Sequence, residues 1–182
     1  MTRLEQLTKR TDVSEQHQEI FDQIVGTRGR ISGPFSVLLH SPEVAGRAAH
    51  LGAYLRFESV LPDDIRETAI ITAAKEMNCE YEWAYHVTIA EDAGVPNEVI
   101  ETIRTGGSIS NLEGNYSAVI SYGRELLGGK RVSDSTFSEN KELFGKQGVT
   151  ELTATMGYYG MLACALNAFE VVPEPGRSTL RD

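Results

Sequence analysis

The chain has 182 residues, enough for one domain with a substantial core, and its hydrophobic (41%) and charged (24%) fractions are typical of a globular protein. Its net charge of −9, without a basic run, argues against a nucleic-acid partner, because phosphate contacts supply most of that affinity. No apolar stretch reaches the roughly 20 residues of a membrane span, and the N-terminus lacks the apolar core of a signal peptide. We therefore expect a cytoplasmic protein that binds neither membrane nor nucleic acid, with its two cysteines unlinked.

Helical periodicity dominates the chain, and no convincing run of residues alternates apolar and polar side chains as a strand does. Residues 13–25 form the first predicted helix, which a glycine-containing loop follows. Ser41 and Pro42 predict the start of the next helix, because serine is a favoured N-cap and proline is tolerated in the first turn. That helix is expected to run to about Ser59, and Pro62 opens another.

Asn78 is predicted to be the N-cap of a helix over residues 79–93, which ends before Pro96. The tail from Pro173 is polar, and we expect it to be poorly ordered or to lie as an arm on a neighbouring subunit. The fold class is all-α. We divide the chain into an N-terminal helix and loop (1–34), a helical domain (35–172) and a tail (173–182). The later helices are predicted at 96–105, 115–128, 133–146 and 149–169.

A faint internal repeat relates Glu67 and the alanine-rich helix around it to Glu151 and residues 152–168. When these two glutamates are aligned, the chemically active residues of the first segment fall on residues that lack their chemistry. A duplication whose second copy kept only its packing role explains this pattern, and so does the chance similarity of two amphipathic helices. In this alignment Cys79 falls on Ala163, Glu82 on Leu166 and His86 on Glu170.

The most informative segment is Cys79-Glu80-Tyr81-Glu82-Trp83-Ala84-Tyr85-His86. In a helix, Cys79, Glu82 and His86 fall within about 60° of one another around the axis. A thiol, a carboxylate and an imidazole would then share one face of a helix that is otherwise rich in apolar residues. Charged groups are costly in such a place unless they pair or take part in chemistry.

Each of these residues has a structural alternative. Glu82 and His86, spaced i, i+4, form either a general acid or base with its orienting partner or an ordinary surface pair. Cys79 is either a thiolate favoured by a helix N-terminus or a small buried apolar residue. Glu67 can reach the same pocket from the preceding helix, or it lies exposed at a helix N-terminus. We predict no metal site, because one glutamate and one histidine make only half of one. The candidate substrate-binding residues are Phe35, Tyr81 and Trp83.

Glu67, the twelve-residue interval, Cys79, Glu82 and His86 together resemble the active-site signature of the carboxymuconolactone decarboxylase and AhpD-like superfamily. The similarity extends over roughly residues 35–172, including Gly33-Pro34-Phe35 and the segment 166–170. The resemblance implies an AhpD-like helical bundle, a small-molecule substrate, no cofactor and a homo-oligomer, either a trimer or a hexamer.

The two branches of that superfamily imply different chemistry. AhpD-like alkylhydroperoxidases carry Cys-x-x-Cys, but Glu82 stands where the second cysteine belongs, so the resolving thiol is missing. The decarboxylase branch resembles this chain at Glu82 and His86, and it implies a lyase in which His86 returns a proton. An enzyme of that branch would need cationic side chains to hold the carboxylates of its lactone substrate. The candidates are Arg28, Arg30, Arg47 and Arg56.

Three hypotheses follow for the function of the chain. The first is a cofactor-free lyase, or a related acid/base enzyme, that acts on a small carboxylated lactone. The second is a peroxidase in which Cys79 reduces a hydroperoxide and an external thiol resolves the sulfenic acid. The third is an oligomer that binds a small ligand without catalysis. The candidate catalytic residues are His86, Glu82, Glu67 and Cys79.

Overall fold

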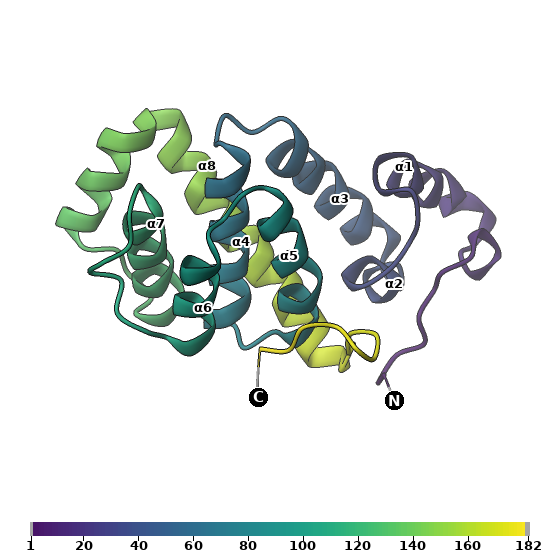
Figure 1. The fold of residues 1–182 in the computed structure, drawn as a ribbon. Helices are drawn as coiled ribbons and strands as arrows, with labels where there is room; N and C mark the ends of the chain where they lie inside the picture. The colour runs from purple at the N-terminus through teal and green to yellow at the C-terminus, as the bar shows by residue number, and fades with distance from the viewer. Residues whose placement is uncertain (1, 181–182) are drawn as a thin grey trace. The chain divides into compact units, whose positions relative to one another are not determined.

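The computed structural model describes residues 2–180, and every regular element in that part of the chain is helical (Figure 1). This confirms the predicted all-α class. The chain divides into two packed units. One comprises the residues up to Glu58 together with Cys164–Val172, and the other comprises Ser59–Ala163 together with the tail from Pro173. No helix in residues 2–180 is both long and apolar enough to cross a membrane.

In the first unit, α1 (Gln18–Arg28) and α2 (Pro34–Leu38) pack against α3 (Pro42–Phe57). The predicted start of α3 at Pro42 is confirmed. The first helix begins later than predicted, because two short 3₁₀ turns, η1 (Arg10–Asp12) and η2 (Glu15–His17), come before it. The short helix α2 was not predicted. Packing groups the N-terminal helix with α2 and α3, whereas residues 1–34 were predicted to form a separate part of the chain.

The second unit is built around α4 (Asp63–Glu76), which packs against α5, α6 and α7 (Figure 1). Nine of its residues, from Ile65 to Ala74, are buried, and they lie all around the helix. A helix that is buried on every side belongs in a core, so any polar residue in its middle is forced inside. The other elements of the unit are α5 (Glu80–Asp92), α6 (Asn97–Thr105), α7 (Tyr116–Gly123), the π-helical turn η3 (Arg124–Gly128) and α8 (Asp134–Phe169) up to Ala163.

The turn between α4 and α5 differs from the prediction by one residue. Cys79, not Asn78, is the N-cap of α5, with an extended backbone at φ −102° and ψ 98°. Asn78 has φ 49°, in the left-handed region that asparagine tolerates better than most residues. Its N–H donates to the carbonyl of Lys75, and the N–H of Cys79 donates to the carbonyl of Ala74. Asn78 therefore ends α4 rather than beginning α5.

The predicted helices at 133–146 and 149–169 are the two halves of α8, which breaks at Gly145 (φ 70°, ψ −179°). The faint internal repeat in the sequence is not matched by the structure of the two segments. The turn that separates Glu67 from Cys79 has no counterpart, because α8 continues without a break from Lys146 through Ala163. Glu151 is buried like Glu67, but its carboxylate accepts hydrogen bonds from the Ser59 hydroxyl and from Gln147. The second segment thus has a structural role.

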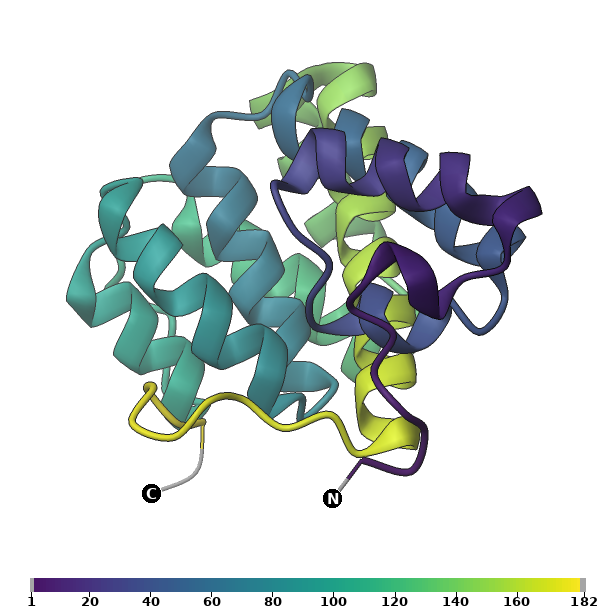
Figure 2. The ribbon, with the colours of Figure 1, turned by 90° about the vertical axis from the view of Figure 1, so that its right-hand side faces the viewer.

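Residues 173–180 of the C-terminal tail, which was predicted to be poorly ordered or to lie on a neighbouring subunit, fold back onto their own unit (Figure 2). The backbone N–H of Leu180 donates to the Glu80 carboxylate at 2.9 Å. The Leu180 side chain is buried in the apolar cluster that includes Trp83 and Val99. One apolar residue and one hydrogen bond therefore attach the tail to the start of α5.

This attachment predicts a measurable stability effect. We expect Leu180→Ala to lower the free energy of unfolding by about 2 kcal/mol, at the low end for a buried leucine because the residue lies near a chain end. Urea denaturation followed by circular dichroism measures the change. Val172→Ala is the control, since Val172 is 71% exposed and should change stability by less than about 0.5 kcal/mol. Equal effects of the two substitutions would contradict a docked tail.

Candidate active site

A buried pair joins α4 to α5. Nδ1 of His86 lies 2.8 Å from Oε2 of Glu67, and the two side chains are 3% and 2% exposed. A carboxylate can only accept, so Nδ1 carries the hydrogen and Nε2 is left available. Glu67 is the fifth residue of α4, in the part of the helix that is buried on all sides. Burial of its charge is costly without a partner, and His86 supplies that partner.

Glu82 lies at the opposite edge of the same imidazole. Its Oε2 is 3.5 Å from Nε2 of His86, a distance too long for a strong hydrogen bond, and its side chain is 5% exposed. The i, i+4 spacing brings the two groups to one face of α5, as the sequence analysis predicted. The hydrogen bond that holds the ring, however, comes from Glu67 rather than from Glu82. The imidazole therefore lies between two buried carboxylates, one at each nitrogen.

Cys79 is fully buried, and it is a free thiol, as is the exposed Cys164. Burial has the largest effect on the Cys79 thiol and raises its pKa. The backbone N–H groups of Glu82 and Tyr81 lower the pKa and the charges of Glu82 and Glu80 raise it, and together these effects bring it to about 12. A thiol with this pKa is neutral at physiological pH. The expected advantage of a helix N-terminus for the thiolate is therefore outweighed by burial and by two carboxylates.

The raised pKa of Cys79 predicts a loss of stability at alkaline pH. Below pH 9 the thiol is neutral in both the folded and the unfolded chain. Between pH 9 and about 12 only the unfolded chain ionises, so each step upward in pH favours unfolding. From pH 7 to pH 10 we expect the wild type to lose about 1.4 kcal/mol more unfolding free energy than Cys79→Ala. Urea denaturation at the two pH values tests this, and parallel losses in both proteins would contradict it.

The three candidate substrate-binding residues lie in different surroundings. Trp83 is completely buried in the cluster formed with Ile71 and Val87, which is the place of a core residue. Tyr81 is half-buried in the first turn of α5. Phe35 belongs to α2 of the first unit, where the Arg28 guanidinium lies 4.4 Å from its ring centroid.

Sequence reasoning missed Tyr159, which brings α8 to the site. Its ring is buried and lies edge-to-face with the His86 imidazole, with centroids 5.0 Å apart and an interplanar angle of 84°. The sequence does indicate a buried position for this residue, because Leu152, Tyr159 and Leu166 are spaced seven residues apart. All three are buried on one stripe of α8, and Tyr159 is the member with a polar tip. Tyr85 contacts the imidazole less closely, at 5.5 Å and 67°.

The surroundings of the site are acidic. The charges that act on the Cys79 sulfur come from Glu82 and Glu80, and two carboxylates flank His86. The four arginines predicted as substrate-binding candidates all belong to the first unit. Within residues 2–180, no three histidine, cysteine or acidic side chains are grouped so that they could hold a metal ion. An imidazole placed between two carboxylates in this way can carry a proton, because the carboxylates compensate its positive charge.

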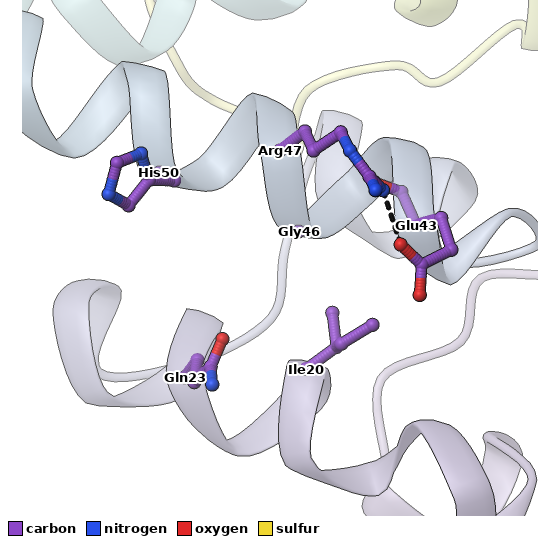
Figure 3. A pocket seen from close by; sticks show the side chains of 6 residues that line it. All are labelled: Ile20, Gln23, Glu43, Gly46, Arg47 and His50. Carbon is purple, nitrogen blue, oxygen red and sulfur yellow. Dashed lines mark hydrogen bonds and ion pairs between the residues drawn. The ribbon is translucent and has the colours of Figure 1, made fainter.

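The first unit contains a separate hollow of about 450 Å³ between α1 and α3 (Figure 3). Arg47, one of the four candidate substrate-binding arginines, lines it, and none of the candidate catalytic residues does. Arg47 and Glu43 point toward each other at its rim and form an ion pair, and their side chains are 77% and 60% exposed. Groups so exposed and already paired do not make a preformed binding site. The lining residues are Ile20, Gln23, Glu43, Gly46, Arg47 and His50.

Solved structures of similar fold include an AhpD-core, uncharacterised peroxidase-related protein from Ralstonia eutropha. Its TM-score is 0.77 at 14% identity, with 96% of this chain and 93% of that chain covered. A cysteine-to-alanine variant of the debrominase Bmp8, in complex with 2,3,4-tribromopyrrole, has a TM-score of 0.75 at 14% identity, with 96% and 94% covered. A putative antioxidant defence protein AhpD from Agrobacterium tumefaciens has a TM-score of 0.67 at 13% identity, with 79% and 99% covered. At these identities the likeness shows a shared fold.

Among proteins of curated function, none matches the sequence significantly. Residues 42–114 match the profile of the Carboxymuconolactone decarboxylase family. That segment contains α4, the turn at Cys79 and α5, which together hold the buried pair and Glu82. The family match over residues 42–114 and the AhpD-like fold of the similar structures agree with the resemblance in the sequence.

Proposed function

We propose that the chain is a cofactor-free enzyme in which His86 transfers a proton to or from a small substrate. The observation that carries the proposal is the buried imidazole with a carboxylate at each nitrogen, 2.8 Å away at Nδ1 and 3.5 Å away at Nε2. Glu67 fixes the ring, and the charges of both glutamates compensate the imidazolium that forms when Nε2 takes up a proton. Nε2 is therefore the atom that exchanges protons with the substrate.

The reaction class that we favour is decarboxylation, or a related lyase reaction, of a carboxylated lactone-type metabolite. Loss of carbon dioxide leaves the bonding electron pair on the adjacent carbon, where it is delocalised into a neighbouring carbonyl. His86 then delivers its Nε2 proton to that carbon and becomes neutral. A proton from solvent restores it, so the cycle uses no cofactor and no redox step.

In this proposal Cys79 acts as a neutral thiol beside the reacting groups. Its pKa of about 12 supports that role, because a neutral thiol is a poor nucleophile. Tyr81, on the same helix as His86, stays a candidate wall of the substrate site. We further propose, from the superfamily resemblance, a homo-oligomer, either a trimer or a hexamer, in the cytoplasm.

A second candidate is supported by the names of the similar structures, two of which are peroxidase-related or antioxidant. Here the Cys79 thiolate attacks the outer oxygen of a hydroperoxide and becomes a sulfenic acid, while the alcohol leaves with a proton from His86. An external thiol then reduces the sulfenic acid, because Glu82 stands where a resolving cysteine would be. Burial and the carboxylates around Cys79 weigh against a thiolate in the resting protein.

The substitution Cys79→Ser separates the two candidates. Wild type and variant are assayed for carbon dioxide release from a carboxylated lactone, and for reduction of tert-butyl hydroperoxide with dithiothreitol. We expect the lactone activity to survive in Cys79→Ser within about 3-fold. If only hydroperoxide reduction is found, and Cys79→Ser abolishes it, the acid/base proposal is wrong and the thiol is the working group. Cys164→Ser is the control for the exposed second thiol.

A further inference from the structure

The His86 ring is held at two points, by its Cβ–Cγ bond to α5 and by the hydrogen bond from Nδ1 to Glu67. Small rotations about the Cβ–Cγ bond still move Nε2, because this atom lies on the other side of the bond axis from Nδ1. The contact at the other nitrogen, 3.5 Å from Glu82, is too long to stop such rotation. If Nε2 is to meet a substrate in a defined direction, a second constraint on the plane of the imidazole is needed.

We propose that Tyr159 provides this constraint and is a positioning residue for His86. The proposal rests on the proposed function, in which Nε2 of His86 exchanges the proton. The two rings are nearly perpendicular, at 84°, with centroids 5.0 Å apart, which is the favoured edge-to-face geometry of aromatic pairs. Rotation of the imidazole out of its plane would bring it against the Tyr159 ring.

Tyr159 can act as a fixed wall because it is itself held in place. It is 5% exposed, and its ring packs edge-to-face on Tyr158 with centroids 5.4 Å apart and planes at 87°. It lies on the buried stripe of α8, next to Met156 and Leu162, which are also buried. The constraint therefore comes from a third helix, whereas Glu67 and Glu82 come from α4 and α5.

The alternative is that Tyr159 only fills space in the core. Tyr122 allows the two roles to be separated, since it is equally buried in the same unit. Its hydroxyl lies 2.7 Å from that of Thr153, and its ring packs among Val119 and Leu152. Loss of either tyrosine removes a large buried side chain, but only the loss of Tyr159 removes a ring from His86.

The test compares Tyr159→Leu, Tyr159→Phe and Tyr122→Leu by two readouts. One is the NMR signal of the His86 ring, assigned with His86→Ala, and the other is kcat and KM. We expect Tyr159→Leu to shift and broaden the His86 signal and to lower kcat about 10- to 100-fold with KM nearly unchanged. Tyr159→Phe keeps the ring, so it should keep both the signal and the activity. Tyr122→Leu should leave the His86 signal in place.

The two readouts distinguish failure of this inference from failure of the proposed function. An unchanged His86 signal in Tyr159→Leu overturns the positioning role, whatever happens to activity. A His86 signal that moves in Tyr122→Leu as much as in Tyr159→Leu overturns it too, because the effect would then be general loosening. Full activity of His86→Ala refutes the proposed function instead, while the NMR comparison still decides whether Tyr159 holds the ring.

Discussion

Replacement of His86 with alanine is expected to lower kcat/KM by about 10²- to 10⁴-fold, the usual contribution of a positioned acid or base. The physical reason is that the imidazole carries the transferred proton on Nε2, and the two other candidate proton carriers beside it are not available for that role. Glu67 is engaged with the opposite nitrogen, and the pKa of the Cys79 thiol, about 12, keeps it protonated. Initial rates of the lactone reaction measure the loss.

His50→Ala is the matched control, because His50 lies exposed on α3 of the first unit and should have no effect. Chemical rescue adds a second test of the role of His86. Imidazole added to His86→Ala should restore part of the rate if the ring works as a proton carrier, and a purely structural histidine would show no such rescue. Activity of His86→Ala within 3-fold of wild type would show that the proton travels by another group.

Local sequence signals predicted the helices well where the chain carries strong start and stop residues. Pro42 is the first residue of α3, where proline is well tolerated, and Pro62 is the residue just before α4, since proline cannot continue a preceding helix. Asn78 was misassigned because asparagine favours both an N-cap and the left-handed residue that ends a helix. Only the hydrogen bonds of Asn78 and Cys79 to the end of α4 decide between the two.

Of the contacts among the candidate residues, the sequence predicted those within one helix and not those between helices. The i, i+4 rule relates Glu82 to His86 within one helix, and it correctly places them on one face. No such rule relates Glu67 to His86, because their contact depends on how α4 and α5 pack across the turn. Tyr159 lies further still along the chain, so only tertiary packing brings its ring to the imidazole. The two carboxylates therefore exchange their predicted roles, because Glu67 rather than Glu82 makes the hydrogen bond that holds the ring.

This exchange of roles gives a prediction of its own, namely that Glu67→Gln loses more activity than Glu82→Gln. A glutamine at position 67 can turn its amide so that it donates to Nδ1, and the hydrogen of the imidazole then moves to Nε2. The ring would keep its position, but its hydrogen would lie on Nε2 instead of Nδ1, and the negative charge of Glu67 would no longer compensate the imidazolium. We expect a fall in kcat of about 10²-fold, in the range seen when the partner of a working histidine is replaced.

Glu82→Gln should cost less than about 10-fold, since its oxygen is 3.5 Å from Nε2 and the hydrogen bond at Nδ1 is untouched. Both substitutions are nearly isosteric and remove one buried charge, so each is the other's control for packing. Unfolding free energies measured in parallel show whether either loss of activity comes from instability. If Glu82→Gln proves the more harmful, the chemistry depends on a carboxylate beside Nε2. Glu82 would then act on the substrate directly, while Glu67 would serve only to hold the ring.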